Sequence, residues 1–141
     1  MNPQNLVRTI VVGVVCTAVM SGFALFAPLF GVTPANVPNL VAMTFGLTPV
    51  IGWVAFFVMG CCFALIYGLC YNILPLQGVM KGITYGVFPW LVTQMVMMPM
   101  MGIGFFSGSM GMALGSLIGY VLFGCCLGYL YRPLLVMKPA Q

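Results

Sequence analysis

Residues 49–71 read PVIGWVAFFVMGCCFALIYGLCY, an apolar run that contains no charged residue. An α-helix needs about 20 such residues to cross the roughly 30 Å hydrocarbon core of a bilayer. Thr48 is placed to cap this helix, and Pro49 suits its first turn. Asn72 and Pro75 end it. The run therefore predicts a membrane-spanning helix.

Three further runs, one before and two after this one, have similar length and composition. They are residues 9–30, 81–101 and 110–131. The prolines and asparagines of residues 31–46 cannot lie unsatisfied in lipid, so this segment must leave the hydrocarbon. Its second half, 39–45, predicts a short interfacial helix. The chain is 63% hydrophobic and 3% charged, which leaves too little polar surface for a water-soluble protein of 141 residues. We predict an all-α fold in which residues 1–141 form one domain, a transmembrane four-helix bundle.

The charged side chains lie on one side of this predicted bundle. They are Arg8, Lys81, Arg132 and Lys138, and with four spans all of them fall on the side that holds both termini and the loop 72–81. Because lysine and arginine mark the cytoplasmic side, we predict a multi-pass protein of the bacterial inner membrane with both termini in the cytoplasm. The cations are too far apart to form a basic patch, so no nucleic-acid partner is expected.

The sequence contains no Asp, no Glu and no His. This inventory removes carboxylate pairs, histidine-dependent nucleophiles and histidine metal sites. We therefore predict that the protein is not an enzyme, and we expect no catalytic residue, no metal site and no cofactor. The six cysteines lie inside apolar runs without a CxxC spacing, so buried thiols are expected rather than disulfides.

An internal repeat links the second and fourth runs. MGCCFALIY (59–67) and FGCCLGYLY (123–131), which stand 64 residues apart, share a glycine, two cysteines and a tyrosine. Chance similarity between two apolar helices is the alternative, because such helices draw on few residue types. The match predicts two duplicated helical hairpins that enter from the same side, as a parallel repeat with its axis along the membrane normal.

The segments GWVAFFVMGCCFALIYGL (52–69), KGITYGVFPWL (81–91), MMPMMG (97–102) and SLIGYVLFGCCLGYLYRP (116–133) carry a resemblance. Nearly the whole chain resembles an uncharacterised family of small four-span bacterial inner-membrane proteins, a domain of unknown function. The resemblance implies a four-span architecture and no established activity. It also implies a histidine four residues before each repeated glycine, and Phe56 and Tyr120 stand there in this chain.

Glycines recur at helical spacing in the last two runs. They predict close helix interfaces, since a missing side chain lets two backbones approach. The positions are Gly82 and Gly86 in the third run, Gly111, Gly115 and Gly119 on one face of the fourth run, and Gly124 and Gly128 on its opposite face. One face of the fourth helix is expected to pack inside the bundle. The second face is then available to other membrane subunits or to a second copy in a homo-oligomer.

Few polar side chains lie at membrane depth. Pro89 removes a backbone hydrogen bond and predicts a kink, with the freed carbonyl near residue 85 satisfied by Thr84, Thr93 or water. Gln94 is the most polar of them, and Thr17 and Ser21 stand in the first run. These groups must bond across helices or line a wet cavity. Interhelical bonding is the interpretation we favour.

Residues 90–101, WLVTQMVMMPMM, are rich in methionine. Met97 and Met101 lie one turn apart, and thioethers and thiols select Cu(I). Methionine is also a flexible packing residue, and no Met-rich soluble loop is present to receive a metal ion. We interpret the stretch as adaptable packing, with a Cu(I) site as the alternative.

Three functions remain open. The first is a non-catalytic accessory or scaffold subunit that packs against other membrane helices. The second is a small transporter or channel for a neutral or apolar solute, with Pro89 as a bend and the polar side chains along the path. The third is a bundle that binds a lipid, quinone or pigment, which the aromatic Phe56, Trp90 and Tyr120 favour.

Overall fold

The computed structural model describes residues 3–34 and 36–136, and within them the side chains of residues 4–34 and 36–131. These described residues contain helices and no strand. The elements in chain order are α1 (Pro3–Phe26), η1 (Ala27–Phe30), α2 (Val37–Thr44), α3 (Pro49–Cys70), α4 (Gly78–Val92), η2 (Thr93–Met97), α5 (Met98–Met100), η3 (Phe105–Gly108) and α6 (Met110–Val136). Of the short elements, η1 and η3 are 3₁₀ turns and η2 is a π-turn.

Among the residues that the structure describes, three helical segments are long and apolar enough to cross a membrane: Gln4–Phe30, Pro49–Cys70 and Met110–Tyr131. They indicate a helical membrane protein. The predicted third span, 81–101, is not among them, because it is divided into α4, η2 and α5. Pro89 lies inside α4 and has no N–H to donate, and the π-turn begins one helical turn after it.

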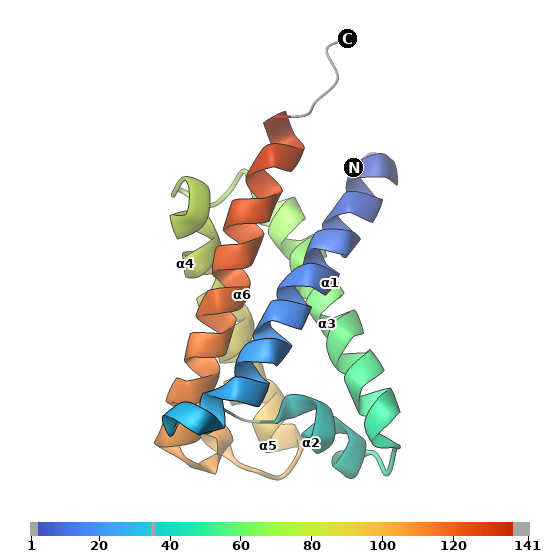
Figure 1. The fold of residues 1–141 in the computed structure, drawn as a ribbon, viewed down its shortest axis with the longest axis vertical. Coiled ribbons are helices and arrows are strands. Elements are labelled where there is room, and N and C mark those ends of the chain that lie inside the picture. The colour runs from blue at the N-terminus through green and yellow to red at the C-terminus, as the bar shows by residue number, and fades with distance from the viewer. Residues whose placement is uncertain (1–2, 35, 137–141) are drawn as a thin grey trace.

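The long helices run side by side, and the connections gather at two ends (Figure 1). The upper end holds the start of α1, the turn 71–77 and the end of α6. The lower end holds η1, α2, α5 and η3. α2 covers this end and packs on α3, and its N-cap Asn36 accepts a hydrogen bond from Asn39 N at 3.4 Å. Thr48 makes no side-chain cap for α3, contrary to expectation, whereas Pro49 occupies the first turn as predicted.

The two hairpins, α1 with α3 and α4 with α6, pack through equivalent positions. A Cβ atom on Gly13 of α1 would lie 2.9 Å from Ala64 Cβ and 3.5 Å from the Gly60 carbonyl of α3. A Cβ atom on Gly82 of α4 would overlap Gly124 and Gly128 of α6, which stand 64 positions after Gly60 and Ala64. Both hairpins also start at the upper end (Figure 1). This packing supports the predicted parallel repeat.

The repeat does not make the bundle symmetric. α1 packs against both α3 and α6, and α4 packs against α6. Among the described residues, α3 and α4 are not a closely packed pair of backbones. Side chains join them instead, since Tyr85 OH donates to the Phe63 carbonyl at 2.7 Å. We call the α1–α6 contact the closed seam and the α3–α4 contact the open seam.

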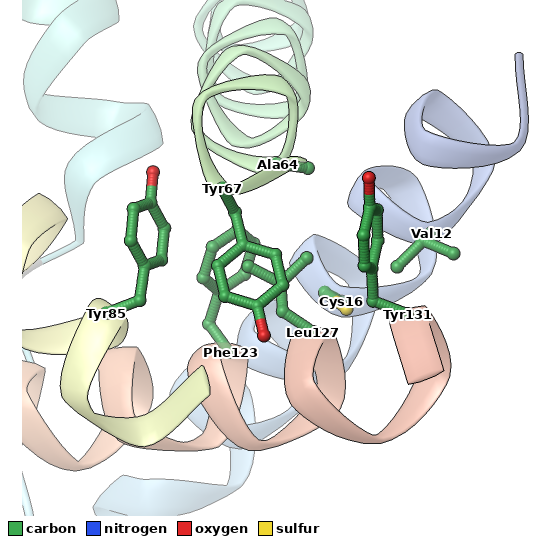
Figure 2. Close-up of a cluster of buried hydrophobic side chains, with 8 residues drawn as sticks. All are labelled: Val12, Cys16, Ala64, Tyr67, Tyr85, Phe123, Leu127 and Tyr131. Carbon is green, nitrogen blue, oxygen red and sulfur yellow. The ribbon is translucent and has the colours of Figure 1, made fainter. Parts of the chain in front are cut away.

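A cluster of aromatic rings fills the bundle in its upper half. Figure 2 shows Tyr67 of α3 between Tyr85 of α4 and Tyr131 of α6. The ring centroid of Tyr67 lies 5.0 Å from that of Tyr85 and 5.4 Å from that of Tyr131. Its side chain is fully buried, and its hydroxyl has no hydrogen-bond partner within the described part of the chain. This cluster keeps α3 and α4 apart where the open seam begins.

Candidate functional site

The broken helix places polar side chains inside the lower half of the bundle. Thr93 and Gln94 begin the π-turn η2, and both are fully buried. Thr93 Oγ1 donates to the Pro89 carbonyl at 2.8 Å, and Thr84 Oγ1 donates to the Met80 carbonyl at 3.0 Å. Neither hydroxyl bonds to the carbonyl of residue 85, so of the three predicted partners only water stays a prediction. A π-turn widens the helix locally and is frequent at functional sites.

Gln94 is held by side chains from two other segments. Ser107 Oγ of η3 donates to Gln94 Oε1 at 2.8 Å, and Gln94 Nε2 donates to Ser116 Oγ of α6 at 3.4 Å. Ser116 Oγ in turn donates to the Met112 carbonyl at 2.6 Å. All three side chains are buried. Gln94 therefore bonds across helices, which is the arrangement that the sequence favoured, and it fastens the broken helix to α6.

Ser107, which no motif in the sequence marks, lies in a strained turn. Phe106 and Ser107 have φ values of 54° and 56°, in the left-handed region that costs an L-residue about 1–2 kcal/mol. The bond from Ser107 to Gln94 helps to hold this conformation. Trp90 Nε1 also donates to the Ala113 carbonyl at 3.0 Å, and the Trp90 ring packs on Phe106. Glycine and serine at 102–109 indicated a turn, but no local signal marks the buried hydroxyl.

Tyr120 connects this polar cluster to a cavity. Its hydroxyl lies 2.8 Å from Thr93 Oγ1. Because the Thr93 hydroxyl proton already points to the Pro89 carbonyl, Tyr120 must be the donor in this pair. The lone pairs of the Tyr120 oxygen remain as acceptors. Phe56 and Tyr120, which occupy the positions where the resemblance implied histidines, both line the cavity.

The cavity has a volume of about 150 Å³ and lies between α1, α2, α3 and α6. A cavity of this size can hold a molecule of about the size of benzene. Apolar and aromatic side chains form most of its lining, with Ser21, Ser116 and Tyr120 as buried polar members and Asn36 as an exposed one. Ser21 Oγ donates to the Thr17 carbonyl at 2.7 Å, just as Ser116 donates within α6. The buried hydroxyl oxygens therefore offer acceptor lone pairs, and their protons are already used.

The other intramembrane polar residue, Thr17, does not join this group. Its hydroxyl donates to the Gly13 carbonyl of its own helix at 2.7 Å, and it packs against Gly60 of α3. Such bonds to the preceding turn satisfy a serine or threonine without any partner helix. Thr17 thus lies in the α1–α3 contact, apart from Gln94.

The glycines occupy interfaces within the chain on both faces of α6. Gly124 and Gly128 meet Gly82 and Gly86 of α4. On the opposite face, Gly115 meets Val32 and Pro34, and Gly119 meets Met20 and Phe23 of α1. Gly111 is exposed, with Ser109 Oγ at 3.8 Å from a Cβ atom placed there. The second glycine face that was expected to be available to a partner is therefore covered mostly by the chain itself.

The methionines converge on a second cavity of about 260 Å³ in the lower half of the open seam. Met59 of α3 and Met97, Met100 and Met101 of the broken helix line it. None of the six cysteines is among its lining residues. All six are free thiols, but the prediction that they are buried holds only for Cys16, and Cys62 is exposed. Within the described residues, no three His, Cys, Asp or Glu side chains form a group that could hold a metal ion. The methionines that line this cavity are thus grouped with one another, and the cysteines do not join them as further sulfur ligands.

Comparison with known proteins places the chain in a family. A family model described as a family of unknown function (DUF6789) matches residues 3–139. The chain therefore belongs to this family, in agreement with the resemblance that its sequence carries. No curated protein and no solved structure matches it.

Proposed function

We propose that this member of the DUF6789 family is a non-catalytic membrane protein that binds a small neutral molecule in the 150 Å³ cavity. One observation carries the proposal: a largely apolar cavity has the buried side chains of Ser21, Ser116 and Tyr120 in its lining. Few precisely placed polar groups in a largely apolar cavity are typical of small-molecule sites. Since no charged residue lines the cavity, a neutral ligand fits it best.

The chemistry of these oxygens narrows the class of ligand. Ser21 and Ser116 donate their protons to helix carbonyls, and Tyr120 donates its proton to Thr93. A ligand that donates a hydrogen bond, such as an alcohol, a phenol or a quinol, is complementary to them. At these three oxygens a quinone or another molecule that only accepts would meet lone pairs, and an unpaired carbonyl there costs about 1–3 kcal/mol.

Phenol and benzaldehyde distinguish these classes, because both rings are close to the size of the cavity. We expect phenol to bind the purified protein about tenfold more tightly than benzaldehyde, in a thermal-shift titration in detergent. The preference should disappear in Ser21→Ala/Ser116→Ala and persist in Gly111→Ala, the matched control outside the cavity. Equal affinity of the wild-type protein for the two compounds would contradict the proposed chemistry.

For topology, we propose four membrane crossings, with α4, η2 and α5 together as the third. The backbone from Gly78 to Met100 is helical along its path from the upper to the lower end, and η2 only widens it (Figure 1). Arg8, Lys81 and Arg132 belong to the upper end, which supports a cytoplasmic location for that end in the bacterial inner membrane. An impermeant maleimide added to intact cells should label Asn36→Cys and spare Lys138→Cys. The reverse labelling would exclude this orientation.

The accessory-subunit and transport hypotheses remain predictions. The glycine faces that motivated a partner subunit lie largely inside the chain. The polar residues that were expected to line a transport path do not lie together. Thr17 lies in the α1–α3 contact, whereas Gln94 bonds to Ser107 and Ser116. A stable complex larger than the monomer in mild detergent would favour the first. Uptake of a neutral solute into liposomes that is lost in Gln94→Leu would favour the second.

A further inference from the structure

Lys81 is a buried cation in a chain that has no acidic side chain. Its side chain is 8% exposed, at the start of α4, and the sequence contains no Asp and no Glu. Its ammonium donates to the Tyr71 carbonyl at 2.6 Å and lies 4.0 Å from the centroid of the Tyr71 ring. These are the interactions that the structure gives it, and they leave at least one of its three N–H groups free. A buried charge normally has a counter-charge, and no side chain of this sequence can supply one.

The first turn of α4 opens beside this ammonium. A cavity of about 470 Å³ is lined by Tyr71, by Lys81 and by residues 77–80. Gln77 precedes the helix without a side-chain cap, so the N–H groups of the first turn have no side-chain partner. The helix dipole adds partial positive charge at this end. A helix N-terminus and a lysine that line one cavity form a binding site for a phosphate group.

An apolar cavity adjoins this site along the open seam. It has a volume of about 410 Å³ and lies between the end of α3 and the first turns of α4. Ile66, Cys70 and Leu74 line one side, and Tyr85 and Phe88 line the other. Lys81 precedes Tyr85 by one helical turn and Phe88 by two, so the three share one face of α4. The positive site and the apolar cavity therefore lie along the same face of α4, one helical turn apart.

We propose that the upper end binds an anionic phospholipid. The phosphate would pair with the Lys81 ammonium and the N–H groups of the first turn of α4, and an acyl chain would lie in the groove between α3 and α4. The adjoining groove favours a lipid over free phosphate, which has no apolar part. The uncompensated ammonium favours an anionic lipid over phosphatidylcholine, whose headgroup carries its own cation. This proposal does not depend on the ligand of the lower cavity.

Native mass spectrometry of the full-length protein with defined lipids tests the proposal. With equal amounts of phosphatidylglycerol and phosphatidylcholine of identical acyl chains, we expect about a tenfold or greater preference for the first lipid at one site. Lys81→Gln should lose that preference, and Lys81→Arg should keep most of it. Arg8→Gln is the matched control, because Arg8 is an exposed cation at the same end.

Two measurements on the wild-type protein keep the test independent of variant folding. Inorganic phosphate at millimolar concentration should not displace the bound phosphatidylglycerol, since it lacks the acyl chain. Complete displacement would identify free phosphate as the ligand and overturn the lipid. Equal binding of the two lipids by the wild-type protein would overturn the proposal as well. Circular dichroism of Lys81→Gln should show the wild-type helix content, and an unchanged lipid preference in that folded variant would exclude Lys81 as the phosphate ligand.

Discussion

The closed and open seams join equivalent helices of the repeat, yet they are packed differently. In the closed seam, Gly119 of α6 lets α1 approach, with Met20 and Phe23 against it. The position equivalent to Gly119 in α3 is Ala55, which lines the methionine cavity of the open seam. The backbones of α3 and α4 stay apart, with one apolar cavity between their side chains and the methionine cavity between α3 and the following segments η2 and α5. A repeat in sequence thus produces one seam that packs and one that has room for another molecule.

The largest expected effect concerns the contact between α4 and α6. Both seams involve one of these two helices, so their comparison assumes that this contact is fixed. In Gly82→Ala the new Cβ would overlap the Gly124 carbonyl, so the two backbones must separate. We expect the free energy of unfolding to fall by about 3 kcal/mol, measured by chemical denaturation in detergent. Gly111→Ala is the control and should change it by less than about 0.5 kcal/mol. Similar values for both variants would mean that α4 and α6 are not packed through their glycines.

A matched pair of leucines tests the seams directly. Gly119→Leu inserts a large side chain between α6 and α1, and overpacking of this kind costs about 1–3 kcal/mol. Ala55→Leu adds a side chain at the equivalent position, where the 260 Å³ cavity can accept it. We expect the free energy of unfolding of Ala55→Leu to lie within about 0.5 kcal/mol of the wild-type value. If Ala55→Leu is the more destabilising of the two variants, the side chains around Ala55 are packed tightly in the membrane and no cavity is present there.

The smallest effects concern the tyrosines of the open seam. Tyr85→Phe removes the hydrogen bond to the Phe63 carbonyl and should lower the free energy of unfolding by about 1 kcal/mol. Tyr67→Phe removes a buried hydroxyl that has no partner among the described residues, so it should leave stability unchanged or raise it. Thermal unfolding followed by circular dichroism measures both. A loss of stability in Tyr67→Phe would show that its hydroxyl has a partner, such as a water molecule.

Most helix ends could be predicted because they depend on local chemistry. Pro49 begins α3 as expected. The bounds of the first and fourth runs were less accurate, because α1 begins at Pro3 and gives way to the 3₁₀ turn η1 after Phe26, and α6 continues to Val136. The helix predicted at 39–45 is observed at 37–44. The third span was wrong in detail. Hydropathy describes residues 81–101 as one apolar run, whereas the π-turn depends on how Pro89, Thr93 and the facing α6 fit together.

The candidate site was predictable only in part. Gln94 and Ser21 were recognised as polar groups in lipid, which is a property of residue type. Their roles differ because Gln94 reaches Ser107 and Ser116, while Ser21 lines the cavity. The burial of Ser107 and Lys81 could not be predicted from the sequence, since a serine in a turn and a lysine near a helix start are usually exposed. Their burial depends on neighbours that are distant along the chain.

The amino-acid sequence by itself determined the environment and the length of the helices, because hydrophobic transfer and the lack of a proline N–H act residue by residue. It also determined that no side chain can serve as a counter-anion, since it contains no Asp and no Glu. Only the tertiary structure decided which glycine face meets which helix, where the cavities lie and that Lys81 is buried. These depend on the fit between surfaces of separate helices, and a pattern within one helix does not specify its partner.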